Sequence, residues 1–459
     1  MAVHSGLCCS AAMRRLGIVL AALLLALVAL MLPARSHGVI NQGYGAKRPI
    51  LYVSPSGSDS GKCTKHAPCR SFARAFKVAS GGSVVHVGSG DYKSSCAALR
   101  GSKSAYVTFV GSRDARVFCQ LAFLGAHHVA VRGLKLYRIH IEASSDLRFQ
   151  NLAVTCVDRA PYRLYRPANL CDATISLENS NDLLFKRMVI GPTYDSAVCG
   201  GDRSNFASGV EHVIFASVTF RDDRWQAAPC GGPNGSGVAH AENFYFSGLG
   251  RPARDITFDS CRFTNGSASG KVVAGSHADG SGPDSASLFL TGAFDHLIVR
   301  NCVFDGADRG PAINGAVDAR ISDSLFENNT WTNSAAFEYP SYPSLRFVNN
   351  LGAQQGCPIS SGLGSSGGIF NDNLWYYQGS GGSADRCGKT DITVSGPKAV
   401  NRIFADFSTG NLHLKRGSPA IGRGDPTMYP ARDHAGVRRP QGRRPDIGAF
   451  EFKVKQKHK

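Results

Sequence analysis

The feature that most constrains the fold of this chain is a nine-residue frame that recurs along it. In the copy at residues 255–263 (DITFDSCRF), apolar residues stand at the second, fourth and ninth positions. Alternation of apolar and polar residues in the first half of the frame is the periodicity of a β-strand. Further copies begin at His128, Asp146, Asp182, His212, His296, Asp318 and Ser344, and residues 368–375 form a weaker one. No helical pattern separates the copies, so the frame predicts a repeat architecture.

The spacing of the copies indicates which repeat this is. Copies start 18, 22 and 26 residues apart where the spacing is tight (128 to 146, 296 to 318, 318 to 344). About 20 to 25 residues suit one coil of a parallel β-helix, and longer gaps suit coils with inserted loops. We therefore predict an all-β, single-stranded parallel β-helix, a solenoid whose stacked coils bury a column of apolar side chains. We expect the sixth-position residues to turn the chain, with side chains that satisfy backbone groups: Asn151, Ser217, Ser260, Asn301 and Asn349.

The N-terminus has the organisation of a secretory signal peptide. Arg14 and Arg15 precede an apolar run over residues 16–32, and Ala34 and Ser36 follow as the small residues that a signal peptidase requires. We predict a signal peptide, or alternatively an uncleaved signal anchor, over residues 1–36, a linker over 37–50, and a secreted, extracellular protein. No later stretch has the length and hydrophobicity of a membrane span.

The cysteine content agrees with export. Two of the 14 cysteines precede the apolar run, which leaves twelve in the exported chain. An even number of cysteines in an exported chain favours disulfides. Cys261 and Cys302 share the seventh frame position, and adjacent coils lie about 4.8 Å apart, within disulfide reach. We predict sequential pairing: Cys63–Cys69, Cys96–Cys119, Cys156–Cys171, Cys199–Cys230, Cys261–Cys302 and Cys357–Cys387.

Both ends of the main segment carry motifs of a known superfamily. Residues 52–59 (YVSPSGSD), 67–72 (APCRSF) and 81–92 (GGSVVHVGSGDY) resemble the N-terminal motif of secreted right-handed parallel β-helix proteins, a superfamily that includes pectate-lyase-like enzymes. Residues 412–422 and 444–451 (RPDIGAFE) resemble its closing segment. The resemblance implies a right-handed β-helix over residues 51–452, followed by a basic tail over 453–459.

A short helix is expected before the first coil. Phe72, Ala75, Phe76 and Ala79 fall on one face of a helix, which would cap the open end of the solenoid. We expect the first strand of the solenoid at residues 84–87.

Charge and motifs narrow the classes of function. Lys and Arg exceed Asp and Glu by 51 to 34, a formal net charge of +17 that suits an acidic polymer. No Gly-rich phosphate loop opens a helix, which argues against a nucleotide enzyme. Ser-His-Asp catalysis has no local signature in the sequence, because the nearest Gly-x-Ser-x-Gly, around Ser236, is degraded. We expect a monomer whose partner is an acidic polysaccharide or a cell-wall glycan.

Polar insertions locate the predicted site. Insertions at one point of successive coils project on one side, and here they follow Ile190, Phe220, Phe263 and Phe304. Residues 240–242 resemble the His-x-Glu motif of a secreted β-helix subfamily, and residues two apart on a strand can act together as an acid/base pair. The alternative is a pair of polar side chains in a solvated loop. We predict catalytic residues Asp222, Asp223, His240 and Glu242, and substrate-binding residues Arg224, Trp225, His277, Asp279, Asp308 and Arg309.

Three mechanisms remain open for such a site. Glycoside hydrolysis needs two carboxyl groups, about 5.5 Å apart for retention or 6.5 to 9.5 Å for inversion. Uronate β-elimination by a polysaccharide lyase needs a base and a cation, often Ca²⁺, for which Asp195, Asp222 and Asp223 are the candidate ligands. The third reading is a non-catalytic cell-surface or adhesion module that holds a glycan by stacking. The aromatic residues considered for stacking are Trp225, Tyr245, Trp331, Tyr339, Tyr342, Trp375, Tyr376 and Tyr377.

Overall fold

The protein is almost entirely composed of β-strands. The computed structural model describes residues 48–93, 96–155, 174–191, 198–201, 209–221, 244–264, 288–305, 313–315, 320–332, 337–338, 344–353, 369–380, 384 and 386–453. All of them belong to the compact unit Arg48–Lys459. No helix in these ranges has the length and hydrophobicity needed to cross a membrane. The prediction of an all-β fold is confirmed.

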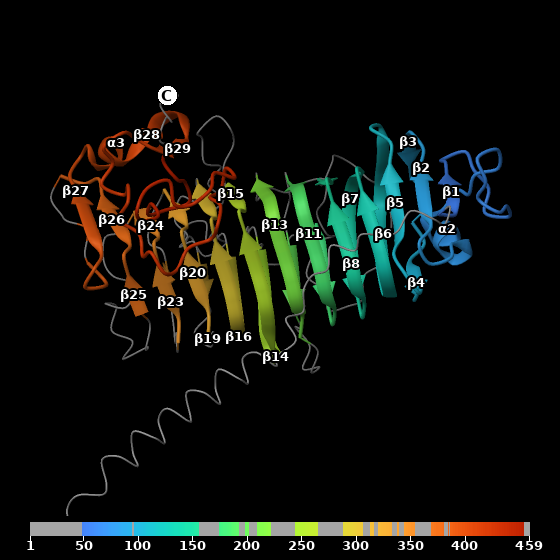
Figure 1. The fold of residues 1–459 in the computed structure, drawn as a ribbon. Helices are drawn as coiled ribbons and strands as arrows, with labels where there is room; N and C mark the ends of the chain where they lie inside the picture. Colours follow the sequence, from blue (N-terminus) through green and yellow to red (C-terminus); the bar gives the residue numbers. More distant parts are fainter. Residues whose placement is uncertain are drawn as a thin grey trace, which may run out of the picture. The chain divides into compact units, whose positions relative to one another are not determined.

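The strands form three parallel ladders, and within a repeat the chain passes through these ladders in turn. Figure 1 shows strands of the first ladder side by side. The first ladder contains the second to fifth frame positions. It comprises β1 (Ile50–Val53), β2 (Val84–Val87), β5 (Val107–Gly111), the end of β6 (Ala115–Arg132), β8 (Ser145–Gln150), β11 (Asn181–Ile190), β13 (Glu211–Arg221), the ends of β14 (Phe244–Asp259) and β16 (Leu288–Arg300), β20 (Leu325–Glu327), β23 (Arg346–Val348) and β25 (Ile369–Asn371).

The second ladder follows the sixth-position bend. It comprises β3 (Gly90–Tyr92), the starts of β6 and β7 (Lys135–Glu142), β9 (Ala153–Val154), the ends of β11 and β13, β15 (Arg262–Thr264), β17 (Val303–Asp305), β21 (Thr330–Trp331), β24 (Leu351–Ala353), β26 (Leu374–Tyr377) and β27 (Ile392–Ser395).

The third ladder precedes the next copy of the frame. It comprises β4 (Leu99–Gly101), the middle of β6, the end of β7, β10 (Ile175–Glu178), β12 (Val198–Gly201), the starts of β14 and β16, β18 (Ile313–Gly315) and β22 (Phe337–Glu338). The short strand β19 (Arg320–Ser322) pairs with residues 293–295 of β16, between the third ladder and the first.

The fourth frame position forms the hydrophobic centre. The rings of Phe149, Phe185, Phe215 and Phe258 stack in succession, with centroids 5.1, 4.8 and 5.1 Å apart and interplanar angles of 9°. All four side chains are fully buried. Burying one Phe side chain contributes about 1.5 to 3 kcal/mol, so this column is a main source of stability. The register of the parallel strands places equivalent positions in line, as the repeat predicts.

Two bends in each repeat explain the polar residues of the frame. First-position residues adopt left-handed backbone conformations (φ 58° at His128, 53° at Asp255), and so do sixth-position residues (φ 53° at Asn151, 54° at Asn301). Asp, Asn and His tolerate this region better than other non-glycine residues. The sixth position therefore turns the chain as predicted. In addition, the amide of Asn301 donates to the Arg432 carbonyl at 2.7 Å.

An internal polar ladder occupies the seventh position in the last repeats. The Oδ1 of Asn350 accepts from the N–H of Asn329 at 3.0 Å, and its Nδ2 donates to the fourth-position carbonyl of Phe326 at 2.8 Å. Asn329 and Asn373 make the same two contacts with the repeats that precede them. The ladder ends at Asp391, which accepts from the N–H of Asn373. We did not predict these inward-facing asparagines.

Two expectations about register are wrong. Leu325 pairs with Ile298, so the copy of the frame in this repeat begins at Asp323, five residues after the predicted start at Asp318. The error arises because residues 318–322 also alternate apolar and polar side chains; in the structure, residues 320–322 are the separate strand β19. The first strand is not β2 at residues 84–87, because β1 pairs with it in parallel.

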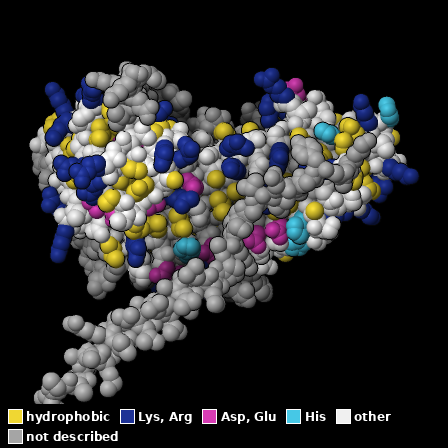
Figure 2. Space-filling model, viewed as in Figure 1, with side chains coloured by type: hydrophobic (Ala, Val, Ile, Leu, Met, Phe, Trp, Pro, Cys, Tyr) yellow, Lys and Arg dark blue, Asp and Glu magenta, His cyan; other side chains and the backbone are white. Residues whose placement is uncertain are grey.

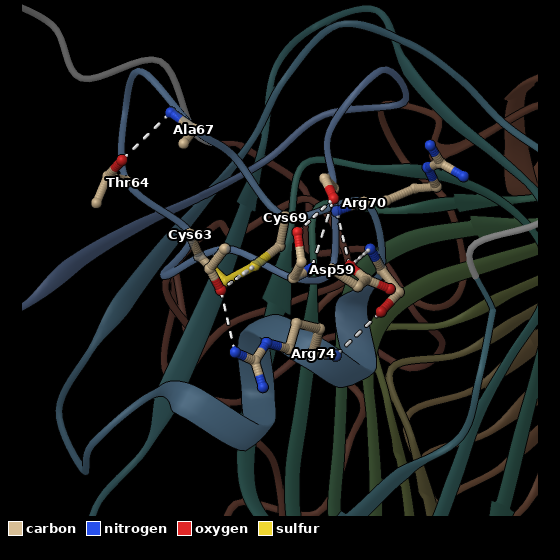
Figure 3. The surroundings of a disulfide bond; sticks show 11 residues. Asp59, Cys63, Thr64, Ala67, Cys69, Arg70 and Arg74 are labelled. Atoms are coloured by element: carbon tan, nitrogen blue, oxygen red, sulfur yellow. Dashed lines mark hydrogen bonds between the residues drawn. A yellow bond between two sulfur atoms is a disulfide. The ribbon is translucent and has the colours of Figure 1, made fainter.

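The N-terminal cap is the predicted helix. Helix α2 (Phe72–Val78) buries Phe72, Ala75 and Phe76, and the side chain of Ser71 caps its start by accepting from the N–H of Arg74. Figure 3 shows the disulfide Cys63–Cys69 beside this helix. The carboxylate of Asp59 accepts from the backbone N–H groups of Arg70 and Ser71, which fixes the loop before the helix.

The predicted disulfides have mixed outcomes. Cys63–Cys69 and Cys96–Cys119 are bonded as predicted. The predicted bridge Cys261–Cys302 is wrong, because both residues are buried free thiols. Cys387 is disulfide-bonded, and its partner is not among the cysteine side chains that the structure describes. Cys156, Cys171, Cys230, Cys357 and the side chain of Cys199 lie outside the described residues, so the remaining pairings stay predictions.

The two free thiols have a physical role that explains why they do not pair. The Sγ of Cys261 donates to the Phe215 carbonyl at 3.3 Å, and the Sγ of Cys302 lies 3.6 Å from the Phe258 carbonyl. These are fourth-position carbonyls, the same groups that the asparagine amides satisfy in later repeats. Cys302 Sγ also accepts from the N–H of Cys261 at 3.4 Å. The thiols therefore continue the polar ladder instead of forming a bridge.

The closing segment packs over the sixth-position bends. It contains α3 (Ala399–Ile403), β28 (Phe404–Asp406), the 3₁₀ turn η1 (Phe407–Thr409) and β29 (Asn411–Leu414), which pairs antiparallel with β28. The Arg439 guanidinium and the Glu451 carboxylate form a fully buried ion pair at 3.1 Å. Asp446 accepts from the backbone N–H groups of Gly422 and Phe452. The charged residues of the RPDIGAFE motif therefore hold this segment together.

Candidate functional site

The residues predicted for the site lie outside the described residues. They are Asp195, Asp222, Asp223, Arg224, Trp225, His240, Glu242, His277, Asp279, Asp308 and Arg309. The insertions that carry them connect the second ladder to the third. For example, β13 ends at Arg221 and β14 begins at Phe244. The third ladder is therefore the part of the described structure that these insertions lead into.

The outward face of the third ladder carries polar side chains that are buried. In β7, Ile139 and Ile141 face the core, so alternation directs Arg138, His140 and Glu142 to the opposite face. His140 is 0% exposed and Arg138 is 8% exposed. Polar residues on the outside of a sheet are usually solvated, and buried ones need specific partners. The outer face of β7 therefore carries charged and polar groups that are shielded from solvent.

His140 links residues from two neighbouring strands. Register places it opposite Ser176 of β10, and its Nδ1 lies 2.8 Å from the Ser176 Oγ. Its Nε2 lies 3.4 Å from Oε2 of Glu142, whose side chain is 40% exposed. Ser176 itself is 6% exposed. A serine hydroxyl, an imidazole and a carboxylate are thus joined in one row.

Burial controls the charge of this row. Desolvation lowers the pKa of His140, and the nearby Arg138 guanidinium lowers it further, whereas Glu142 acts in the opposite direction. The imidazole is therefore neutral at neutral pH. A carboxylate can only accept, so the neutral ring donates its Nε2–H to Glu142 and accepts the Ser176 hydroxyl hydrogen at Nδ1. Both ring nitrogens are engaged, and the group that can react with a substrate is the serine oxygen.

Sequence patterns missed this row for a topological reason. His140 and Ser176 are 36 residues apart and lie in the third ladder, between copies of the recurring frame. The available signal was alternation, since residues 138–142 and 175–178 read as strands with polar outer positions. Nothing in the sequence predicts that β10 stacks on β7 in the register that joins His140 to Ser176.

A second histidine–serine pair provides a contrast. The Nδ1 of His127 lies 2.8 Å from the Oγ of Ser145, the same distance as in the row described above. This pair is only partly buried, and among the described residues no carboxylate contacts His127. The hydrogen bond is therefore common to both pairs, whereas the carboxylate and the burial occur only at Ser176.

Histidine or aspartate occupies the first-position bend in most repeats. His212 contacts Asp182 at 3.6 Å and Asp255 at 3.1 Å, and His296 also contacts Asp255. Figure 2 shows Asp, Glu and His side chains along the lower part of the visible face. These side chains are between 39% and 55% exposed, so solvent weakens each of these contacts. Their left-handed backbone conformation explains why these residue types recur.

Metal and stacking sites receive no support from the described residues. Among them, no group of three His, Cys, Asp or Glu side chains is placed to hold a metal ion. Trp331, Trp375 and Tyr376 are at most 2% exposed, so the idea that they stack on a glycan is wrong. Tyr377 packs against the core, and the side chains of Trp225, Tyr245, Tyr339 and Tyr342 lie outside the described residues.

Comparison with solved structures supports the fold. The chain is similar to the crystal structure of a pectate lyase (Pel9A), with a TM-score of 0.52 and 14% identity over 90% of this chain and 98% of that one. It is also similar, at a TM-score of 0.38, to a rhamnogalacturonan lyase (12% identity, 75% and 87% coverage) and to a mannuronic-acid-specific family 6 lyase from human gut microbiota (12% identity, 72% and 87% coverage). No protein-family model and no curated sequence matches the chain. The chain therefore shares the pectate lyase fold.

Proposed function

We propose that this protein is an exported, right-handed, single-stranded parallel β-helix protein that acts on an acidic polysaccharide as a lyase or glycoside hydrolase. The shared fold and the net charge of +17 support this assignment. The observation that carries it is the polar outer face of the third ladder, the ladder that the predicted site insertions enter, where Arg138 and His140 are buried. A face used only for solubility would leave these groups solvated.

Export and domain organisation belong to the same proposal. Residues 1–36 act as a signal peptide, residues 51–452 form the β-helix, and residues 453–459 form a basic tail. Two native disulfides support an oxidising compartment, since such bonds persist mainly in exported proteins. In that compartment, the basic protein meets acidic cell-wall or extracellular glycans.

The proposed lyase chemistry assigns roles to residues of the insertions and to a residue of the third ladder. Elimination requires a base for the proton next to the uronate carboxylate and a cation to neutralise that carboxylate. We assign the base to His240, positioned by Glu242, and the cation to Arg138. Ca²⁺, if bound by Asp195, Asp222 and Asp223, would supply further positive charge for the carboxylate. Hydrolysis would instead use two carboxyl groups, such as Asp222 and Glu242, without elimination.

A panel of acidic glycans tests the proposal. The purified mature protein should release reducing ends from at least one polyuronate, and absorbance of unsaturated uronates should accompany them if the enzyme is a lyase. Glu242→Gln and His240→Ala should reduce turnover at least 100-fold while the thermal midpoint stays within a few degrees. Tight binding without product release would instead support the non-catalytic module. The absence of both binding and product across the panel would contradict the proposal.

A further inference from the structure

We propose that Ser176 is the nucleophile of an ester-cleaving site, whose substrates are carboxylic esters carried by the polysaccharide. This inference rests on the proposed function for the identity of the polymer. It rests on the row of Ser176, His140 and Glu142 for the chemistry. Acidic polysaccharides carry esters as O-acyl groups or as esterified carboxylates, so one polymer can present both substrates.

The geometry of the row satisfies the requirements of an activated serine. The base must lie within about 2.6 to 3.2 Å of the nucleophile, and the Ser176 Oγ to His140 Nδ1 distance is 2.8 Å. A third group must orient the base, and Glu142 lies 3.4 Å from the other ring nitrogen, a contact of the looser kind found without substrate. In the serine protease triad, Nε2 of the histidine faces the serine and Nδ1 faces the carboxylate. Here Nδ1 faces Ser176 and Nε2 faces Glu142, but the imidazole is still the base and the carboxylate still orients it.

The state of the imidazole favours the same reaction. A neutral His140 can take the hydroxyl proton, whereas a protonated one cannot. The carboxylate of Glu142 then stabilises the imidazolium that forms. Arg138 lies two residues before His140 on the same face of β7, and its positive charge helps to keep the imidazole neutral by lowering its pKa.

The reaction is balanced without any cofactor. The Ser176 oxygen attacks the ester carbonyl carbon while its proton moves to His140 Nδ1. The tetrahedral intermediate collapses, the C–O bond to the alcohol breaks, and His140 returns the proton to that alcohol. Water then attacks the acyl-serine with His140 as the base, which releases the carboxylic acid and restores the serine. The net reaction is the hydrolysis of one ester by one water molecule.

A serine-directed fluorophosphonate tests the nucleophile independently of any glycan. We expect the native protein to be labelled at Ser176, as mapped by peptide mass spectrometry. Ser145, which has an equally short histidine contact without the carboxylate, should remain unlabelled. Ser176→Ala and His140→Ala should abolish labelling, and Glu142→Gln should slow it at least tenfold. A label on neither serine, or an equal label on both in native protein, would overturn the proposal.

Ester substrates separate this inference from the proposed function. We expect the protein to release p-nitrophenolate from p-nitrophenyl acetate, and acetate or methanol from an esterified polyuronate. Ser176→Ala should lower ester release at least 100-fold, whereas Ser145→Ala should leave it unchanged, with both variants matching the parent in circular dichroism. Ester release without chain cleavage would support Ser176 and contradict the lyase. Chain cleavage that persists without any ester release or labelling would overturn the role of Ser176 alone.

Discussion

The seventh frame position is filled in two different ways in the two halves of this molecule. In the earlier repeats it holds Leu152, Met188 and Val218, all buried among apolar side chains. In the later repeats it holds Asn329, Asn350 and Asn373, which are equally buried and hydrogen-bonded from one repeat to the next. The backbone bend is the same in both halves. One position can therefore be stabilised by apolar volume or by a continuous chain of hydrogen bonds.

Cys261 and Cys302 lie between these two halves and combine their properties. A thiol is a small apolar group that can also act as a weak donor and acceptor. Burial raises the pKa of the Cys302 thiol well above its usual value, so the group stays protonated and keeps its donor. The pair therefore belongs to the packing of the seventh position, between the apolar and the hydrogen-bonded repeats.

The largest expected effect comes from breaking the polar ladder. Asn350→Leu removes the acceptor for Asn329 and the donor for Phe326, which leaves several buried backbone and side-chain groups unsatisfied. We expect a loss of about 3 to 5 kcal/mol in the free energy of unfolding, measured by urea titration.

A matched substitution in the apolar half serves as the control. Met188→Leu introduces the same residue at the same frame position but conserves volume and removes no hydrogen bond. It should cost less than about 1.5 kcal/mol. Equal losses for the two variants would refute the distinction between the halves.

The distinction also explains how far the sequence predicts this fold. Apolar second, fourth and ninth positions are visible as a pattern, and they predict the parallel column of Phe149, Phe185 and Phe215. The asparagines at the seventh position were not predicted, because a polar residue in a repeat is read as exposed unless its partner is known. The partner of each asparagine lies in a neighbouring repeat. The sequence pattern places the start of one such repeat at Asp318 instead of Asp323. Once Asp323 is the first position, Asn328 and Asn329 fall at the sixth and seventh positions.

The candidate site was less predictable than the fold. The sequence pattern favours residues in loops rich in Asp and His, such as His240, whereas strand residues with similar chemistry fit the pattern of the scaffold. The contact between His140 and Ser176 depends on which strands stack, and the insertion between β9 and β10 hides that order in the sequence. Burial of Arg138 is equally invisible in a local pattern. A site formed by residues of two coils can be recognised only when the register of the stacked strands is known.

A smaller expected effect is a pH dependence of the folding stability that arises in the later repeats. Glu327 lies at the fifth position of a later repeat, where the earlier repeat has Ala216, and it is 6% exposed. Burial raises its pKa from 4.5 to about 6, although Arg300 and Arg439 act against this shift and Asp259 and Asp425 act with it. The folded state thus favours the neutral acid, and its contribution to stability is present below about pH 4.5 and is lost as pH rises through 6.

Glu327→Gln tests this contribution. A rise in the pKa of Glu327 from 4.5 to about 6 corresponds to about 2 kcal/mol, so the parent should lose up to that much stability relative to the variant between pH 4.5 and 7. Urea titrations at several pH values measure the difference between the two proteins. Parallel pH profiles for the parent and the variant would show that Glu327 does not titrate in this range.

The smallest effect concerns the boundary between the two halves. Cys302→Asn introduces the asparagine that the later repeats have at the seventh position. Its amide can pair with the two backbone groups that contact the Cys302 thiol, the Phe258 carbonyl and the N–H of Cys261. We expect the free energy of unfolding to change by less than about 1 kcal/mol, because the amide replaces a weak thiol contact with a stronger one but needs slightly more space. Cys302→Val keeps the volume and removes both polar contacts, so it should cost about 1 to 2 kcal/mol more. If valine is tolerated better than asparagine, Cys302 belongs to the apolar half, and the polar ladder begins only at Asn329.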